Sequence, residues 1–337
     1  MATALREVTP PALSDDAPLA PLLDAVEREI DLLSRSQRPL ELRFGATSIP
    51  RDVYVQSLRH FVELGRAARD TADFLAAVGR DYRFYRASIG DSTLVTSYYE
   101  PIIRGSRTPT EHYSRPLYRR PPDLRAPYYT REEIDSKNKL AGRGLELCWV
   151  DPIDAFVLQT EGSGTVRFDD GSTLALDYAG TNGRPHERLS RFLKDVIPAK
   201  AMSMQSIEAY LRGLPIERMQ SVLDRNPHYV FFQERAGSGP ATSLGVAPTD
   251  GRTIATDARY FPKGALAYLV TTRPVFDDAS AQAPSAWAPL ARFVLDQDTG
   301  SGIKGARVDL FWGSGEDAAR FAGVMKQKGQ VYYLVPR

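Results

Sequence analysis

Residues 296–315 read Asp-Gln-Asp-Thr-Gly-Ser-Gly-Ile-Lys-Gly-Ala-Arg-Val-Asp-Leu-Phe-Trp-Gly-Ser-Gly. The glycines in the first half of this stretch permit a tight backbone that approaches its neighbours closely. The run from 306 to 312 then alternates as a strand does, with Val308, Leu310 and Trp312 on one face. Asp309 lies on the other face, although aspartate is depleted in strand interiors. The pattern therefore predicts a turn followed by a strand. Asp309 is either a site carboxylate or a solvated residue paired with a cation such as Arg307.

Other polar residues around this stretch also have two interpretations. Asp296 and Asp298 flank a turn, where aspartate commonly stabilises the loop through its own backbone contacts. Asp257 ends a predicted strand before a Pro-Gly turn, so it is either a strand-end cap or a site residue. Lys304 is either a solvated loop charge or a ligand contact. The residue types alone do not decide between these roles.

The composition is that of an ordinary globular chain with room for two domains. It has 337 residues, 42% of them hydrophobic and 25% charged. The 43 basic and 42 acidic side chains give a net charge of +1, which argues against a dedicated nucleic-acid binder. The 24 prolines, 25 glycines and 16 tyrosines favour turns and strands over a helical bundle.

Most common catalytic signatures are absent from the sequence. The single cysteine, Cys148, lies in an apolar run and is predicted to be a packed thiol. The histidines are scattered without the spacing of metal ligands, at positions His60, His112, His186 and His228. There is no phosphate-binding loop, dinucleotide fingerprint or nucleophile elbow. Carboxylate chemistry without a metal or cofactor is what remains.

The periodicity of apolar residues predicts helices and strands in separate blocks. Helical spacing covers 22–33, 55–62 with an extension to 74–75, 186–197, 203–212 with Ser203 as N-cap, 216–225 and 316–326. Strand patterns cover 93–99, 145–150, 155–160, 165–168, 173–178 and 229–233, with Asp170-Gly171 as a hairpin turn. Residues 102–130, rich in Pro, Arg and Tyr, are predicted to form an extended crossing between domains. This order favours β-barrels decorated by helices over a doubly wound sheet.

Several sequence blocks resemble the membrane-bound lytic murein transglycosylase A family in the same order. The strongest are 297–305 and 307–313, together with a three-aspartate pattern matched by Asp257, Asp298 and Asp309. Upstream blocks of the same kind are Tyr98-Tyr99-Glu100-Pro101, 116–119, 162–164, 178–183, 202–207 and 226–232. The resemblance runs from Tyr98 to the C-terminus, and its strength lies in the agreement of many separate blocks.

The resemblance implies a fold that is mainly β with helices. We expect a double-psi β-barrel domain from residues 20–102 and 236–337, after a flexible lead-in over 1–19. A second, smaller β-barrel domain over 103–235 would be inserted into it and form the other wall of a glycan groove. The implied location is the periplasm of a Gram-negative bacterium in association with the outer membrane, although residues 1–21 carry neither a signal peptide nor a lipid-attachment cysteine.

The implied activity is non-hydrolytic cleavage of peptidoglycan glycan strands by a monomer. Asp309 would act as acid and then as base, with Asp298 orienting it and stabilising charge on the sugar. Burial beside Phe311 or Trp312 and repulsion from Asp298 would raise the pKa of Asp309. The expected substrate-binding residues are Thr96, Tyr98, Tyr99, Ser163, Gly164, Gln205, Asp257 and Lys304. For the tyrosines, sugar stacking and plain core packing both remain open.

Three departures from the family pattern bear on substrate fit. Glu161 replaces a glutamine, Ser97 replaces a glycine, and His186 to Ser190 replace a further motif. Two alternatives therefore stay beside the transglycosylase. One is a carbohydrate-binding protein without turnover. The other is a hydrolase that pairs Asp309 with Asp298 or Glu161.

Overall fold

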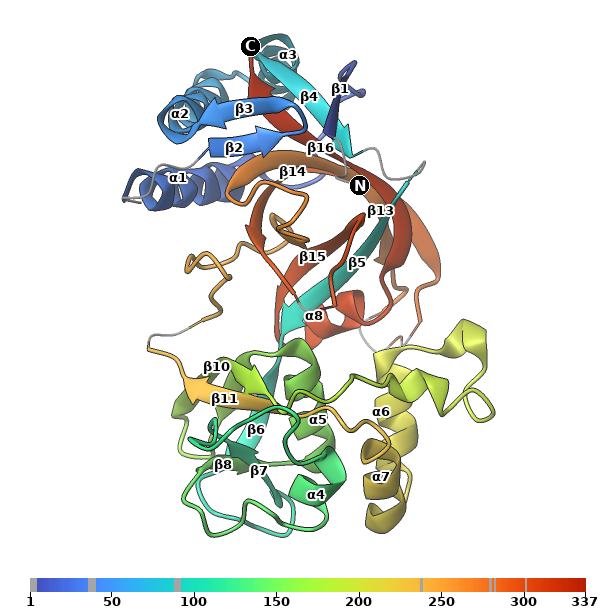
Figure 1. Ribbon diagram of the computed structural model, residues 1–337. Coiled ribbons are helices and arrows are strands. Elements are labelled where there is room, and N and C mark those ends of the chain that lie inside the picture. Colours follow the sequence, from blue (N-terminus) through green and yellow to red (C-terminus); the bar gives the residue numbers. More distant parts are fainter. Residues whose placement is uncertain are drawn as a thin grey trace. The chain divides into compact units, whose positions relative to one another are not determined.

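A computed structural model describes residues 5–35, 41–87, 92–236, 239–278, 281, 283–300 and 302–337. The chain divides into two compact units. The first contains 1–98, 241–313 and 325–337, and the second contains 99–240 and 314–324. The second unit is thus inserted into the chain of the first, and each unit is built around its own sheet (Figure 1).

The sheet of the first unit closes into a six-stranded barrel. Its strands are β5 (Thr93–Glu100), β12 (Thr253–Thr256), β13 (Ala265–Val275), β14 (Ala286–Asp298), β15 (Arg307–Ser314) and β16 (Lys326–Pro336). They follow the order β16-β13-β14-β12-β15-β5, and pairing of β16 with β5 closes the ring. Strand β12 is parallel to β14 and antiparallel to β15. Strands β4 (Tyr82–Ala87) and β1 (Leu5–Val8) extend the sheet from β16.

The predicted flexible lead-in is wrong for residues 5–18. Strand β1 pairs with β4 from Leu5 to Val8, and the segment after it is tied to two buried arginines. Arg252 donates to Asp15 at 2.7 Å and to the carbonyls of residues 17 and 18, while Arg292 donates to Asp16 at 2.7 Å. Sequence patterns cannot show these contacts of Asp15 and Asp16, because the two arginines lie more than 230 positions away.

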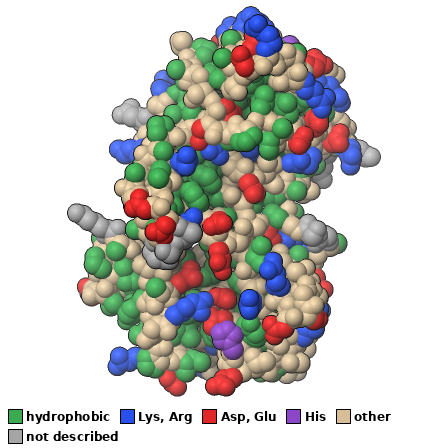
Figure 2. Space-filling view, turned by 180° about the vertical axis from the view of Figure 1, so that it is seen from behind, with side chains coloured by type: hydrophobic (Ala, Val, Ile, Leu, Met, Phe, Trp, Pro, Cys, Tyr) green, Lys and Arg blue, Asp and Glu red, His purple; other side chains and the backbone are tan. Residues whose placement is uncertain are grey.

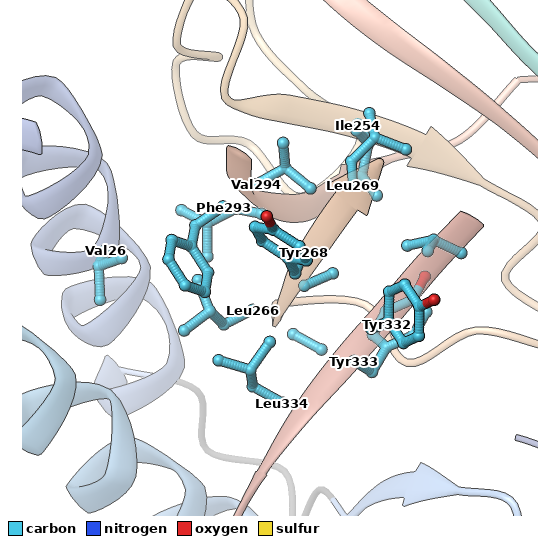
Figure 3. Packing of buried hydrophobic residues seen from close by; sticks show 14 of the residues in the cluster. Val26, Ile254, Leu266, Tyr268, Leu269, Phe293, Val294, Tyr332, Tyr333 and Leu334 are labelled. Carbon is cyan, nitrogen blue, oxygen red and sulfur yellow. The ribbon is translucent and has the colours of Figure 1, made fainter. Parts of the chain in front are cut away.

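Three helices pack on the barrel and complete its core. They are α1 (Leu19–Arg35), α2 (Arg51–Ala67) and α3 (Thr71–Asp81), accompanied by the hairpin of β2 (Glu41–Phe44) and β3 (Thr47–Pro50). Val26 of α1 belongs to one buried cluster with Leu266, Tyr268, Phe293 and Leu334 of the strands (Figure 3). Full burial of such a side chain contributes about 1.5–3 kcal/mol. The core therefore joins the early and the late parts of the chain.

The second unit holds a smaller sheet with the order β11-β10-β9-β6-β8-β7. Its strands are β6 (Ile102–Ser106), β7 (Arg115–Tyr118), β8 (Glu146–Val150), β9 (Gly164–Arg167), β10 (Thr173–Thr181) and β11 (Val230–Glu234). A parallel bridge between Arg119 and Phe232 joins the two ends of the sheet. The predicted hairpin is confirmed: Gly171 takes a positive φ of 82° in the turn between β9 and β10. Residues 102–130 contribute β6 and β7 to this unit, so the predicted crossing between domains is wrong.

Two local predictions in this unit are also wrong. Residues 155–160 are helical within α5 (Pro152–Glu161), because Asp151 caps the N-terminus and Gly162, at φ 87°, ends the helix. An apolar run buried on several sides shows neither period clearly. The helix predicted over 186–197 is only a 3-10 turn, Leu189–Arg191. The remaining helices are α4 (Arg131–Asp135), α6 (Met204–Arg212), α7 (Ile216–Leu223) and α8 (Gly315–Ala322), with a 3-10 turn over Ala199–Ala201.

Ser203 caps α6 as predicted, since its side chain accepts from the amide of Ser206. On the face that Figure 2 shows, Lys and Arg side chains of the described residues are interspersed with Asp and Glu. This distribution matches the net charge of +1 and offers no broad positive surface on that face.

Candidate active site

Asp309 occupies the middle of β15, with β12 on one side and β5 on the other. Its side chain is buried, with 8% of the residue exposed. Thr96 of β5 donates its hydroxyl to Oδ1, and Arg307 donates from Nη2 to Oδ2 at 3.4 Å. The interpretation as a solvated residue is therefore wrong, although the pairing with Arg307 exists.

Burial raises the pKa of Asp309 above its usual range, because the ionised form loses water. The charge of Arg307 and the hydrogen bonds from Thr96 and Arg307 oppose this rise, and the negative charge of Asp298 adds to it. The expected direction of the shift is confirmed, with desolvation as the larger of the two expected causes. A carboxyl of this kind can hold a proton closer to neutral pH than an exposed aspartate.

Asp298 lies at the end of β14, which pairs with β12, the strand that also pairs with β15 of Asp309. Ala255 of β12 pairs with Asp298 on one side and with Asp309 on the other, so two strand spacings of roughly 4.8 Å each separate the two backbones. Oδ1 of Asp298 accepts from the amides of Ser243 at 2.9 Å and Thr299 at 2.8 Å. These bonds fix the direction of the carboxylate.

Tyr98 contacts both the carboxylate of Asp298 and the ring of Phe311 in β15. Its hydroxyl donates to Oδ2 of Asp298 at 2.9 Å, and its ring packs on Phe311 with centroids 5.2 Å apart. Burial and the negative charges of Asp298 and Asp309 raise its pKa well above the usual value, so the phenol stays protonated and remains a donor. Tyr98 is thus hydrogen-bonded within the site rather than only packed in the core.

The third aspartate of the pattern has a different environment. Asp257 accepts from Arg259 at 2.6 Å and from the amide of Gly305 at 2.9 Å. The hydrogen bonds from Arg259 hold the pKa of Asp257 well below its usual range. It therefore stays ionised and ties the glycine-rich loop to the end of β12. Lys304 lies in that loop with an exposed side chain.

The other predicted binding residues belong to the second unit. Burial, followed by the charges of Glu161 and Glu208, raises the pKa of Tyr99, which places it near those carboxylates. Ser163 is partly exposed just after the glycine that ends α5. Gly164 is buried, and an added Cβ would lie 2.8 Å from the Pro101 carbonyl. Its smallness is therefore a packing requirement.

Gln205 has a structural contact within the second unit. Its amide donates to the carbonyl of Ala319 in α8 at 2.7 Å. The structure thus groups the predicted residues in two sets. Asp309, Asp298, Thr96 and Tyr98 come together in the first unit, whereas Tyr99, Ser163, Gly164 and Gln205 lie in the second.

Sequence reasoning missed two groups that hold this site. Ser243 contacts Asp298 through its backbone amide, for which the side chain gives no signal. Lys263 donates to the main-chain carbonyl of Asp298 at 2.7 Å. The sequence shows that Lys263 lies in a Pro-Gly turn near Asp257, but it does not show that the ammonium group reaches Asp298. Within the described part of the chain, no three His, Cys, Asp or Glu side chains form a group that could hold a metal ion.

Comparison with known proteins places these elements in a family. Residues 94–233 match the model of the MltA specific insert domain, and residues 252–335 match the model of the 3D domain. Lytic transglycosylase LtgG of Burkholderia pseudomallei is 32% identical over 100% of this chain and 99% of its own, with a TM-score of 0.65. The chain belongs to the membrane-bound lytic murein transglycosylase A family.

Other members agree with this assignment. The membrane-bound lytic murein transglycosylase of Agrobacterium tumefaciens has a TM-score of 0.77 at 28% identity, over 99% of this chain and 98% of its own. Membrane-bound lytic murein transglycosylase A of Vibrio cholerae is 29% identical over 72% of this chain, and the match spans 65% of that relative. The predicted fold class, a double-psi β-barrel domain with a smaller inserted β-barrel, is confirmed.

Proposed function

We propose that this protein is a lytic transglycosylase that cleaves the β-1,4 bond between N-acetylmuramic acid and N-acetylglucosamine in peptidoglycan. The observation that carries this proposal is the buried Asp309 carboxyl on the β15 strand of the 3D domain, with its raised pKa and the second carboxylate of Asp298 nearby. The similarity to proteins named lytic murein transglycosylase A or lytic transglycosylase supports the reaction class.

In this mechanism Asp309 acts first as an acid and then as a base. It protonates the glycosidic oxygen, and the bond from that oxygen to C1 of the muramic residue breaks. The C6 hydroxyl of the same residue then forms a bond to C1 and gives its proton to Asp309. The product is a 1,6-anhydro sugar, no water is consumed, and Asp309 recovers its initial protonation state.

The neighbours of Asp309 support both steps. Asp298, held by three hydrogen bonds, stabilises positive charge that develops at C1. The hydroxyl of Thr96 and the guanidinium of Arg307 keep the Asp309 carboxyl in one orientation, and they stabilise its ionised form after the first transfer. Because burial raises the pKa of Asp309, its ionised carboxylate readily accepts the proton of the C6 hydroxyl in the second step.

The proposal also covers the residues that bind the glycan, the oligomeric state and the location of the protein. Tyr99, Ser163, Gly164 and Gln205 contribute binding contacts from the inserted unit, Asp257 does so from the end of β12, and Lys304 from the loop before β15. The substrate is the peptidoglycan strand, the protein acts as a monomer, and its location is the cell envelope. Its relatives are named membrane-bound, while no helix in the described ranges is long and apolar enough to cross a bilayer.

A two-carboxylate hydrolase is the second candidate, because Asp298 lies near Asp309 across one strand. Digested peptidoglycan separates the two by mass spectrometry and borohydride reduction. A transglycosylase releases anhydro ends that resist reduction, whereas a hydrolase releases ends that are heavier by one water and are reduced. Reducible muramic ends as the major product would establish the hydrolase. Glycan binding without either product would establish a binding protein.

Glu161 provides a further check on the single-acid mechanism. It ends α5 close to Tyr99, and we expect it to tune binding without donating the proton. The Glu161→Gln variant should therefore keep at least roughly a tenth of the parent activity, above the loss of about 10²–10⁴-fold for a missing general acid. A loss in that larger range would move the acid from Asp309 to Glu161.

A further inference from the structure

The end of β14 contains a bulge beside the proposed active site. Ile254 of β12 pairs with Asp296, but the next residue, Ala255, pairs with Asp298, so Gln297 is an extra residue on β14. Bulges are frequent next to active sites because they redirect the side chain that follows. The direction of Asp298 therefore depends on how this bulge is held.

Strand β13 cannot hold the bulge on its other side. Pairing between β13 and β14 begins with Ala265 opposite Asp296, so residues 297 and 298 extend beyond the ladder. The side chain of Gln297 is anchored, since it donates to Glu29 at 2.7 Å and accepts from Thr253 at 2.7 Å. The backbone of Asp298 still requires a donor where β13 has ended.

Lys263 supplies this donor from the turn before β13. Its Nζ lies 2.7 Å from the carbonyl oxygen of Asp298, 2.6 Å from Oδ1 of Asp296, and 2.9 and 2.6 Å from the carbonyl and hydroxyl oxygens of Thr256. One ammonium thus ties the end of β12 to the end of β14. A lysine suits this role because it presents three donors on a compact head.

The positive charge of Lys263 is neutralised by the carboxylate of Asp296 and not by that of Asp298. Asp296 is fully buried and also accepts from Thr256 and Tyr333, each at 2.6 Å. The ion pair of Lys263 with Asp296 therefore belongs to the interior. The contact with Asp298 is made through the main chain and leaves its carboxylate to Tyr98, Ser243 and Thr299.

We propose that Lys263 is a positioning residue: by holding the main-chain carbonyl of Asp298 beyond the end of β13, its ammonium sets the direction of the Asp298 carboxylate. The importance of this direction for turnover rests on the proposed transglycosylase function. The hydrogen-bond geometry itself does not depend on that function.

The test compares Lys263→Met with the double variant Lys263→Met/Asp296→Asn. The single variant leaves Asp296 without its cation, so it lowers stability as well as activity. The double variant removes both charges, so its melting temperature should return toward that of the parent. Its kcat for release of anhydro products should nevertheless stay roughly 10–100-fold low, with KM within about threefold, because misplacement of a catalytic group reduces turnover by such factors.

A pH profile separates positioning from general damage. The charge of Asp298 contributes to the raised pKa of Asp309, and Asp309 must begin the reaction protonated. Displacement of Asp298 therefore lowers that pKa and moves the alkaline limb of kcat to lower pH in the double variant. Lys328→Met, which removes an exposed lysine of β16, is the matched control and should leave the profile unchanged.

A double variant that regains the parent kcat would overturn the proposal, and so would an unshifted alkaline limb. A crystal structure of the double variant provides a readout without turnover. Loss of the Tyr98–Asp298 hydrogen bond supports the proposal, and an unchanged bond overturns it. Failure of the parent protein to release anhydro ends would contradict the proposed function, while the crystal structure would still decide the role of Lys263.

Discussion

Both units bury a carboxylate near arginine, yet the surroundings of the two groups differ. In the second unit Asp135 lies between Arg115 and Arg131, each 3.5 Å away. In the first unit Asp309 has one guanidinium at 3.4 Å and the hydroxyl of Thr96. Burial raises the pKa of both carboxyls, opposed by their arginines. A raised pKa alone therefore does not identify a catalytic acid.

The difference lies in what surrounds each carboxylate. Arg115 also bonds the carbonyl of Asp135 and the side chain of Gln220, and Arg131 bonds the carbonyls of Asn226 and His228. Asp135 is thus one part of a network that joins loops. Asp309 has fewer cationic partners, and Asp298 with its own hydrogen-bond donors lies on the other side of the single intervening strand, β12. We infer that Asp135 stabilises the second unit and that Asp309 serves chemistry.

The sharpest test of this contrast is Asp309→Asn. The amide has nearly the same shape but cannot donate and recover a proton, so turnover should fall toward the upper end of the 10²–10⁴-fold range. Folding and glycan binding should persist, which circular dichroism and a binding assay on peptide-free strands would check. A variant that still digests peptidoglycan at roughly a tenth of the parent rate or faster would remove Asp309 from the mechanism.

The reciprocal change, Asp135→Asn, should act on stability instead. Removal of one partner from a buried charge network costs about 3–5 kcal/mol in the free energy of unfolding. Chemical denaturation would measure this loss. The kcat of the folded fraction should stay within roughly twofold of the parent, because an interaction outside the reacting groups contributes little to the transition state. A large fall in kcat with unchanged stability would reverse the two assignments.

A third buried carboxyl, that of Glu29 in α1, should make the stability of the first unit depend on pH. Desolvation and the charge of Asp296 raise its pKa from 4.5 to about 7, while the hydrogen bond from Gln297 opposes the rise. The folded state therefore binds this proton more tightly than the unfolded state. The stability that it contributes is present below pH 4.5 and is lost as pH rises toward 7.

Glu29→Gln should remove this loss of stability at rising pH, because the amide of glutamine does not ionise. Relative to the parent, the variant should gain stability between pH 5 and pH 8 by up to about 3 kcal/mol, the value of a shift of this size. Urea denaturation of both proteins across that range would measure the gain. Parallel stability curves for parent and variant would show that Glu29 does not titrate in this interval.

Local patterns predicted the elements whose signal lies within a few residues. The alternation over 306–312 corresponds to β15, and Ser203 caps α6 because its partner lies three positions away. Predictions failed where burial on several sides hid the period, as in α5, and where distant partners decided the conformation, as in residues 5–18. The family blocks supplied the barrel topology, which periodicity alone could not have produced.

Residue types and spacing along the chain predicted that Asp309 lies in the middle of a strand, two positions after Arg307, and that Asp298 lies in the preceding block of the family pattern. The folded chain alone shows that Asp309 is buried, that Ala255 pairs with both aspartates, and that Lys263 donates to the carbonyl of Asp298. The physical reason is that pKa and side-chain direction depend on water exclusion and on groups brought together by strand pairing, whereas residue type and spacing describe only neighbours along the chain.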